Sequence, residues 1–567
     1  MVVTINVGLD ISVKVNPFDP DVINRIKQVF GRSYDPMFKT WHVPLQSWNE
    51  LVKIPRLAPY SAQLEELYKK YINSIRTGYT KEITVKNYDM LYEFQKEGVR
   101  TLLSLKNAML CDELGLGKTN MAITASKQLL EDKLIDSVLI VSPKSLVTHW
   151  VNELQRWIEE TDVNVIKGDT ATRQAKWIDI KNHNFSITNY EILLKDYKII
   201  TPHIQEAFDK NKEGQTVQYK PINNGITNNS LIILDEATRI KNWHAKTTKI
   251  IRSLPYKYIY AISGLPIENS PNELFTIVSV LRNNIIGHNY NAFCERYVRS
   301  IDPPILKNVD DLKERLSSIM IRRLKKDVAS FLPPLTINPY YIELSDKEHE
   351  DYINIVDKLS AAIQIYIDKK TVITQQNILS LMSILRMYCD HPALVQLSDS
   401  ETAMQIKYEL KATKSSKFDE LKNILNDIPQ DKQIVIFTEF EKMANYIVRN
   451  IDSSCEFSGK NSADERDIII SDFLDNKYRI LVSTDAGGYG LNLANSTYVI
   501  NYDIPYNPAK LQQRIMRVHR LTSIEPVTAI NMIVSDEEKI EQHVKGILRN
   551  KQDMAEKIIG ELGIEKV

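Results

Sequence analysis

The sequence lacks the features of a secreted, disulfide-framed or membrane-spanning protein. Its 567 residues include four cysteines, which lie far apart and show no paired spacing of a zinc site: Cys111, Cys294, Cys389 and Cys455. This usage fits free thiols in a reducing compartment. No apolar run is long enough to span a bilayer, and the N-terminus lacks the basic start and apolar core of a signal peptide. We therefore expect a cytoplasmic protein with no membrane partner.

An excess of one charge is also missing. The 72 Lys and Arg residues balance the 72 Asp and Glu residues, so the whole-chain charge gives no information about an anionic partner. Any nucleic-acid site would have to be a local patch. The hydrophobic content of 43% is that of an ordinary globular protein. The chain contains neither a short-period repeat nor a low-complexity tract.

Short apolar runs alternate with helical patterns in two regions of the chain. From about residue 85 to about residue 280, runs such as Ser137–Val141 and Leu231–Leu234 predict buried strands of a parallel sheet. A second region, from about 415 to 535, has expected strands at Ile434–Thr438, Arg479–Ser483 and Tyr498–Asn501. The predicted fold class is α/β, with two parallel-sheet lobes, helical insertions between their motifs and a small α+β unit at the N-terminus.

These patterns also set the expected domain boundaries. They are an N-terminal accessory unit at 1–75, a first lobe at 76–284, its helical insertion at 285–335, a second lobe at 336–535 with a helical insertion at 346–400, and a charged helix at 536–567. Residues 197–229 are polar and rich in Asn and Lys, which indicates an insertion to which the sequence assigns no role.

The most informative motif is a glycine-bearing loop between an expected strand, Asn107–Cys111, and an expected helix. The loop consists of Asp112, Glu113, Leu114, Gly115, Leu116, Gly117, Lys118 and Thr119. Backbone N–H groups of such a loop cradle phosphates, Lys118 would reach the β/γ-phosphate oxygens, and the Thr119 hydroxyl would bind Mg²⁺. The motif predicts a nucleoside triphosphate and its metal. Because Asp112 replaces the first glycine of the general pattern, a simple glycine turn before a helix stays open here.

Acidic and glycine-containing motifs follow two more expected strands. Asp235 and Glu236 come directly after Leu231–Leu234, where Asp235 would hold Mg²⁺ and Glu236 would orient and deprotonate the attacking water. The alternative is an acidic helix N-terminus. Ser263–Asn269 follows the strand Tyr258–Ile262 and would sense the γ-phosphate, although Gly and Pro also mark ordinary turns.

The second region carries a glycine-rich loop and a pair of arginines. The loop, Ser483–Leu493, contains Gly490 and would let backbone amides approach a phosphate closely. Arg517 and Arg520 are three residues apart, which predicts that they share one face of a helix. Two guanidinium groups suit the spread charge of a transferring phosphoryl group. A solvated basic face is the alternative for this segment taken alone.

The order of these motifs resembles that of superfamily-two helicase-like motors, specifically the Swi/Snf family of DNA translocases, over roughly residues 88–535. The resemblance implies RecA-like lobes, ATP with Mg²⁺, an adenine-reading Gln95 and catalytic roles for the residues named above. Further segments similar to family motifs are Leu91–Gly98, Ile140–Leu146 with Trp150 and Glu153, Ile187–Glu191, Ile321–Val328, Cys389–Leu394 and Ser415–Asp419.

Some positions depart from the family pattern. Thr238 stands where His is usual, Met516 where Gly is usual and Leu265 where Thr is common, but no catalytic group is lost, so we expect an active ATPase. The basic run at 322–326 is interpreted as a duplex-facing patch or a solvated face rather than a nuclear address.

The N-terminal unit has its own resemblance. Tyr34, Asp35, Trp41, Pro44 and Leu45 are similar to the small accessory domain of annealing helicases that rewind DNA at forks. We expect its aromatic residues, such as Tyr34 and Trp41, to belong to the core, and DNA stacking is the alternative. No histone-tail reader module is present in the sequence.

The predicted function is an ATP-dependent translocase on double-stranded DNA that remodels or rewinds branched DNA, such as replication forks, in DNA repair. Two alternatives stay open. The same motor could remove proteins such as a polymerase from DNA, or the chain could be a DNA-binding scaffold without ATP hydrolysis. The Lys118, Glu236, Arg517 and Arg520 side chains argue against the scaffold.

Overall fold

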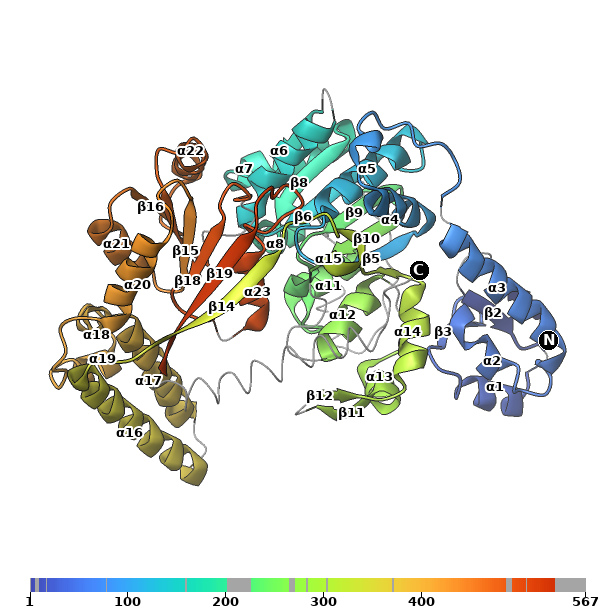
Figure 1. The fold of residues 1–567 in the computed structure, drawn as a ribbon. Helices are drawn as coiled ribbons and strands as arrows, with labels where there is room; N and C mark the ends of the chain where they lie inside the picture. The colour runs from blue at the N-terminus through green and yellow to red at the C-terminus, as the bar shows by residue number, and fades with distance from the viewer. Residues whose placement is uncertain are drawn as a thin grey trace. The chain divides into compact units, whose positions relative to one another are not determined.

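The computed structural model describes residues 2–5, 10–16, 18–77, 79–158, 161–200, 226–264, 271–281, 284–301, 304–369, 372–485, 492–505 and 507–535 (Figure 1). The chain divides into two compact units, and the second begins at Phe331. Four predicted features lie wholly or largely outside the described residues: the helix at 536–567, most of the insertion at 197–229, residues 265–269, and Gly490 with its neighbours.

The first unit opens with a small antiparallel sheet and three helices. The sheet has the strand order β1 (Val2–Ile5), β2 (Asp10–Lys14), β4 (Thr40–Pro44) and β3 (Ser33–Asp35). The helices are α1 (Pro20–Ile26), α2 (Trp48–Leu51) and α3 (Ser61–Thr77). Asp19 caps α1, where its Oδ1 accepts hydrogen bonds from the backbone N–H groups of Asp21 and Val22. The predicted small α+β unit is confirmed, and we call it the accessory unit.

A seven-stranded parallel sheet forms the centre of the first unit. Its order is β13 (Met320–Ile321), β5 (Asn107–Leu110), β10 (Tyr258–Ile262), β9 (Ser230–Leu234), β6 (Ser137–Ser142), β8 (Phe185–Asn189) and β7 (Val163–Val165). Because all neighbours are parallel, the carboxyl ends of β5, β10 and β9 lie side by side at one edge. Ligands of open α/β sheets bind at this edge.

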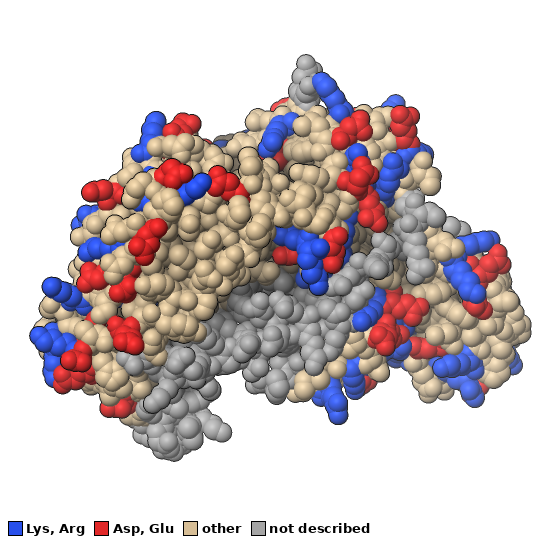
Figure 2. All heavy atoms as spheres, viewed as in Figure 1, with Lys and Arg blue, Asp and Glu red and all other residues tan. Residues whose placement is uncertain are grey.

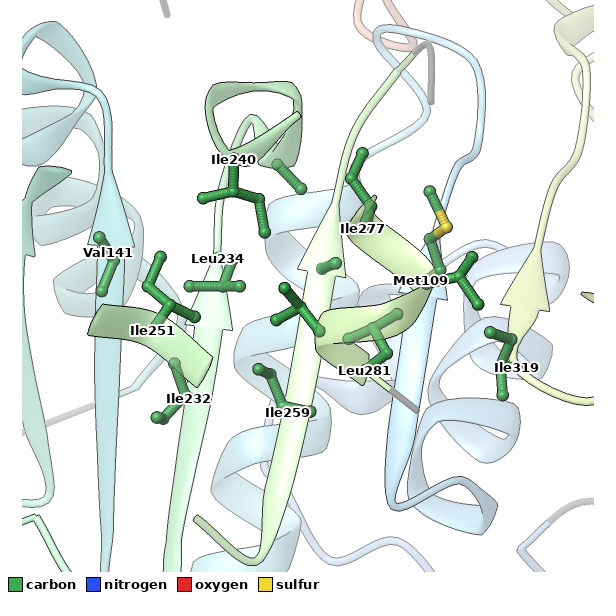
Figure 3. Packing of buried hydrophobic residues seen from close by; sticks show 14 of the residues in the cluster. Met109, Val141, Ile232, Leu234, Ile240, Ile251, Ile259, Ile277, Leu281 and Ile319 are labelled. Carbon is green, nitrogen blue, oxygen red and sulfur yellow. The ribbon is translucent and has the colours of Figure 1, made fainter. Parts of the chain in front are cut away.

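Apolar side chains from both faces of this sheet form its core. Figure 3 shows Ile251 of α11 (Lys246–Ser253) and Leu281 of α12 (Pro271–Leu281) packed over the strand residues Ile232, Ile259 and Met109. Helices α4 (Glu93–Ser104) and α5 (Lys118–Glu131) lie behind the strands in this view. The central strands read as continuous apolar runs because helices cover both of their faces.

The segment predicted to be a helical insertion is only partly helical. It contains α13 (Tyr290–Tyr297) and α14 (Val309–Ser317), with a hairpin of β11 (Val298–Ile301) and β12 (Pro304–Leu306) between them. It then supplies β13, whose Met320 and Ile321 pair with Met109 and Leu110 of β5. The end of the expected insertion is therefore an edge strand of the first sheet.

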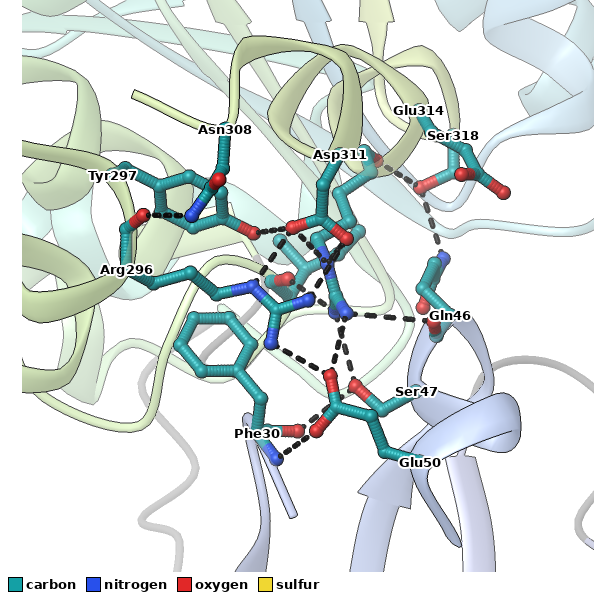
Figure 4. A network of polar contacts seen from close by, with 12 residues as sticks. Phe30, Gln46, Ser47, Glu50, Arg296, Tyr297, Asn308, Asp311, Glu314 and Ser318 are labelled. Carbon is teal, nitrogen blue, oxygen red and sulfur yellow. Dashed lines mark hydrogen bonds and ion pairs between the residues drawn. The ribbon is translucent and has the colours of Figure 1, made fainter. Parts of the chain in front are cut away.

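The accessory unit is attached to α13 and α14 by a buried network around Phe30 (Figure 4). The Phe30 ring packs edge-on against the Tyr297 ring, with the two ring centroids 5.7 Å apart. Arg315, 1% exposed, donates to Ser47 Oγ at 3.0 Å, and Glu50 accepts from Arg296 at 2.6 Å and from the Phe30 N–H at 2.9 Å. The accessory unit thus has a core of its own, and Phe30 packs into the core of the first unit's large sheet.

The second unit is built on a six-stranded parallel sheet. Its order is β14 (Leu335–Ile342), β19 (Val527–Val534), β18 (Tyr498–Asn501), β15 (Ile434–Thr438), β17 (Ile480–Thr484) and β16 (Ser454–Phe457). The predicted strands of this lobe are confirmed, with β17 beginning one residue later than expected. The helices of the expected insertion include α16 (Asp346–Lys369) and α17 (Val372–Asp390). Two parallel-sheet lobes with helical insertions are therefore confirmed.

On the face shown in Figure 2, acidic and basic side chains are interspersed. Among the described residues, no helix is both long and apolar enough to cross a membrane. The four cysteines are free thiols, and three of them are buried.

Candidate nucleotide-binding site

The phosphate loop lies between the end of β5 and the start of α5, as predicted. Gly115 and Gly117 have φ values of 84° and 77°, in the left-handed region that favours glycine, and Gly117 directly precedes the helix. The first backbone N–H groups of α5 have no intrahelical partner, which makes this helix end suited to phosphate. The residues present therefore fit a nucleotide phosphate chain.

Lys118, the first residue of α5, lies over the loop that precedes it. Its Nζ donates to the backbone oxygens of Asp112 at 2.7 Å and Glu113 at 3.1 Å. Burial lowers the pKa of Lys118, while the carboxylates of Asp112, Glu236 and Asp235 oppose that shift. The structure thus brings both residues of the acidic motif close enough to Lys118 to act on its charge.

The acidic motif is held by residues from two other elements. Trp150 of α6 (Val147–Trp157) donates its indole N–H to Asp235 Oδ2 at 2.7 Å. Tyr190, at the start of α8 (Tyr190–Lys195), donates its hydroxyl to the Asp235 backbone oxygen at 2.7 Å. Asp235 Oδ1 accepts from the Glu236 N–H at 3.0 Å. These contacts fix the carboxylate of Asp235 in one orientation.

Glu236 has an unusual backbone. Its φ of 47° lies in the left-handed region, which a residue with a long side chain rarely adopts. Such strain collects at functional sites because the surrounding structure must hold it. Burial and the charges of Asp235 and Glu236 also raise the pKa of Tyr190 well above its usual value, so its hydroxyl stays a donor. The geometry is that of a rigid acidic turn beside the phosphate loop.

The end of β10 also contacts the phosphate loop. The Ser263 N–H donates to the Leu110 backbone oxygen at 3.1 Å. A Cβ added to Gly264 would lie 2.5 Å from Leu114 Cδ2, so any larger residue here would require the Leu114 side chain to move. The rest of the predicted γ-phosphate-sensing segment, residues 265–269, lies outside the described residues.

Gln95 lies on α4 against the phosphate loop. Its Nε2 donates to the Leu116 backbone oxygen at 3.0 Å, and its Oε1 accepts from the Tyr92 N–H at 3.0 Å. The side chain is buried, and the neighbouring rings of Tyr92 and Phe94 are stacked with centroids 6.0 Å apart. Both ends of the Gln95 amide are therefore engaged within the protein, and the residue connects α4 to the loop.

The interpretation of the basic run at 322–326 as a duplex-facing patch or a solvated face is wrong for three of its members. Arg322, Arg323 and Lys325 are buried, and only Lys326 is clearly exposed. The run follows β13 across the phosphate loop, where backbone oxygens and the buried carboxylate of Asp112 need donors. Arg323 pairs with Asp112 through two hydrogen bonds, Nε to Oδ1 at 3.1 Å and Nη2 to Oδ2 at 2.6 Å.

The predicted arginine pair of the second unit does not share a helical face. Helix α23 (Pro508–Ile515) ends before Arg517, and both Arg517 and Arg520 lie in the turns that follow. Both are partly buried. The three-residue spacing was a sound helix signal, but the chain leaves the helix at Ile515 to form bends towards β19. The two positions are therefore set by the turns rather than by a helix axis.

Sequence reasoning missed Arg514, the most buried arginine of this segment. Its Nε donates to Asp485 Oδ1 at 2.6 Å and its Nη1 donates to the Asp503 backbone oxygen at 2.6 Å. Burial alone would raise the pKa of Asp503, but Arg514, Arg386 and the hydrogen bonds from Thr438 and Glu439 together outweigh it, so the pKa is lowered. Arg514 thus joins the start of the glycine-rich loop to the end of β18. The only signal in the sequence was its place in the same segment as the predicted pair.

The family-like segments near residues 390 and 417 meet in the interior of the second unit. Lys417 Nζ lies 3.0 Å from Asp390 Oδ1, and both side chains are buried. The Tyr502 hydroxyl donates to the Asp390 backbone oxygen at 2.6 Å. These contacts attach the end of α17 to α20 (Ser416–Asp427) and to the residue after β18. Their role is to fasten the helical insertion to the sheet.

Comparison with known protein families decides what this arrangement is. Residues 94–394, more than half of the chain, match the SNF2-related domain. The chain belongs to the SNF2-related family. Residues 416–522 match the helicase conserved C-terminal domain, and residues 11–69 match the HepA-related protein (HARP) domain, which coincides with the accessory unit. This SNF2 protein is an enzyme, a DNA-dependent ATPase of the helicase-like class.

Curated relatives are ATP-dependent helicases and remodelling ATPases. The uncharacterized ATP-dependent helicase YqhH of Bacillus subtilis is 27% identical, over 80% of this chain and 76% of its own. The putative ATP-dependent helicase/translocase YwqA of the same species is 30% identical, over 83% and 49%. The ISWI chromatin-remodeling complex ATPase ISW1 of Saccharomyces cerevisiae is 26% identical, over 81% and 40%. The SNF2 protein thus spans half or less of the last two.

Among solved structures, the Sulfolobus solfataricus SWI2/SNF2 ATPase core in complex with dsDNA is 25% identical to this chain. The match covers 84% of this chain and 94% of that one, with a TM-score of 0.38. The Pyrococcus furiosus Hef helicase domain is 16% identical, over 82% and 100%, with a TM-score of 0.47.

Proposed function

We propose that this SNF2 protein is an ATP-driven translocase on double-stranded DNA that remodels or rewinds branched DNA such as replication forks, in DNA repair. The observation that carries the motor part is the convergence of Lys118, Asp235 and Glu236 at one edge of a parallel sheet. The HARP match of the accessory unit supports the branched substrate. The translocase relative supports movement along DNA.

Each residue of the nucleotide site has a proposed task. The phosphate-loop N–H groups and Lys118 hold the phosphates, Thr119 and Asp235 hold Mg²⁺, and Glu236 orients the attacking water and takes its proton. Bound Mg²⁺ would neutralise charge on the phosphate oxygens. Arg517 and Arg520 are assigned the stabilisation of charge on the transferring phosphoryl group.

The remaining predicted residues have supporting tasks. Gly490 would contribute a backbone amide to a phosphate, and Gln95 would border the base. The Gln95 amide is engaged with Leu116 and Tyr92, so adenine reading by this residue requires it to exchange one of those partners. The alternative task is to hold the loop against α4. Base selectivity of a Gln95→Ala variant for ATP over GTP separates the two.

The experiment for the proposed function measures ATP hydrolysis without DNA and with single-stranded, duplex and forked DNA. We expect duplex DNA to stimulate hydrolysis and forked DNA to stimulate it at least as strongly, with a steep loss at high salt because phosphate contacts dominate such binding. A strand-rewinding assay on a fork with a displaced strand is the second arm. Hydrolysis that no DNA stimulates would overturn the translocase. Stimulation without rewinding would restrict the protein to another duplex-based task, such as protein removal.

A further inference from the structure

The segment that leads out of the first unit follows the phosphate loop residue by residue. The Cys111 N–H donates to the Ile321 backbone oxygen at 2.7 Å, and the Glu113 N–H donates to the Arg323 backbone oxygen at 2.9 Å. Glu113 Oε2 then accepts from the Lys325 N–H at 2.7 Å. The pairing of β13 with β5 is thus continued past both strands, along the first residues of the loop.

The Arg323 side chain crosses the base of the loop and touches three elements. It pairs with both carboxylate oxygens of Asp112 in the loop, donates to the Phe94 backbone oxygen of α4 and lies 3.3 Å from Met121 Sδ of α5. Its guanidinium also lies 5.5 Å from the Phe94 ring centroid. Arg323 therefore contacts α4, the phosphate loop and α5 at once.

Gly98 on α4 makes room for this arrangement. A Cβ at this position would lie 2.5 Å from Arg323 Nη2 and 2.5 Å from Met121 Sδ. Since Gly98 sits within a helix, where glycine is unfavourable by roughly 1 kcal/mol relative to alanine, the close approach of Arg323 supplies the reason for it. Arg322 acts alongside, donating to the Cys111 backbone oxygen at 2.9 Å.

A path of two contacts leads from Arg323 to the ammonium of Lys118. Arg323 holds the carboxylate of Asp112, which is fully buried, and the backbone oxygen of the same Asp112 accepts from Lys118 Nζ at 2.7 Å. A buried ion pair adds little net stability over an apolar pair of the same size, but it fixes the geometry of what it joins. The fork of an arginine fixes two carboxylate oxygens at once, which a lysine cannot do.

We propose that Arg323 is a positioning residue of the ATP site, which sets the conformation of the phosphate loop and the place of Lys118 through Asp112. The inference rests on the ATPase activity and is independent of the DNA substrate. A displacement of catalytic groups by about 1 Å can cost a factor of about 10² in rate. Loss of the Arg323 fork therefore changes how tightly the phosphates are held.

The test compares Arg323→Lys, Arg323→Met and the double variant Asp112→Leu/Arg323→Met with the wild type. Lys326→Met is the matched control, because Lys326 lies in the same segment and is exposed. The readouts are the thermal midpoint, the affinity for a fluorescent ATP analogue, and KM and kcat for ATP. The double variant removes both charges, so it restores stability without restoring the fork.

We expect Arg323→Lys to raise KM and weaken analogue binding by about tenfold, with the control unchanged. We expect the double variant to keep a thermal midpoint near that of the wild type and to show the same loss of affinity. If Arg323→Met does not fold, the other two variants decide the test. Wild-type KM in Arg323→Lys, or full recovery of nucleotide affinity in the double variant, would overturn the proposal. Because analogue binding needs no hydrolysis, a wild type that binds but does not hydrolyse ATP would refute the ATPase and leave this test intact.

Discussion

Trp150 Nε1 and Asp235 Oδ2 lie 2.7 Å apart in the interior of the first unit. The indole has no acceptor function and donates only, so it holds one carboxylate oxygen of the acidic motif without competing for a metal ion. A hydrogen bond to an ionised group contributes about 1.5–3 kcal/mol. A residue far from Asp235 in the sequence therefore fixes the orientation of the proposed Mg²⁺ ligand.

Replacing Trp150 with Phe should lower kcat by about tenfold or more and raise the Mg²⁺ concentration needed for half-maximal activity, because Asp235 loses its fixed orientation. A Mg²⁺ titration of ATP turnover measures both. Trp157→Phe is the control, since Trp157 lies on the same helix and donates to Glu153 outside the site. Equal effects of the two substitutions would assign Trp150 to packing alone.

Lys118→Ala and Glu236→Gln should both nearly abolish hydrolysis, for different reasons. Lys118→Ala removes a phosphate contact and should weaken nucleotide binding, whereas Glu236→Gln removes the base and should leave binding nearly unchanged. Equilibrium binding of a nucleotide analogue, measured beside turnover, separates the two. Wild-type turnover in Glu236→Gln would show that the acidic motif is misassigned.

Alanine at Arg517 or Arg520 should lower kcat by about 10³-fold while ATP affinity changes little, because their proposed contact is made in the transition state. Arg514→Met should instead lower the thermal midpoint of the second unit, since it leaves Asp485 and the buried carboxylate of Asp503 without their arginine partner. If Arg514→Met keeps its thermal midpoint and only its kcat falls, Arg514 acts in catalysis and the assignment of roles to the three arginines is wrong.

Arg315→Met should destabilise the first unit by about 3 kcal/mol, because Ser47 Oγ and the backbone oxygen of Ile285 lose a buried donor and Asp311 keeps only Arg296 and Tyr297. Hydrogen exchange should rise in the accessory unit and in α14 together. Lys307→Met, an exposed neighbour, serves as the control. Faster exchange confined to α14 would show that the accessory unit holds its fold without this junction.

The parts of the fold that could be predicted are those set by local pattern. The strands at Ser137–Ser142, Ser230–Leu234 and Tyr258–Ile262 are buried on both faces, so their apolar runs identify them without tertiary information. The phosphate loop could be recognised equally well from the sequence, because the loop requires glycines in the left-handed conformation and a helix directly after them, and both are local features. Strand β13 was missed because a two-residue strand carries no period.

The supports of the site could not be read in the same way. Arg322 and Arg323 look like surface residues in the sequence, since a charged side chain is buried only where a distant segment supplies acceptors. Here the acceptors are backbone oxygens at Cys111 and Phe94 and the carboxylate of Asp112. Arg514 could not be predicted from the sequence for the same reason. Pairings of this kind depend on which strands become neighbours, and no single segment contains that information.

The junction around Phe30 limits how this protein can be recombined with others. A Cβ on Gly31 would lie 2.4 Å from the Asn284 backbone oxygen, so the two surfaces fit only as a matched pair. A chimera made by cutting near residue 75 would separate Arg315 from its acceptors at Gln46 and Ser47. The accessory unit would then be joined to a motor that lacks the residues against which Phe30 packs. The part that must be transferred as a whole is therefore discontinuous in sequence. It consists of the accessory unit and the segment from Asn284 to Ser318.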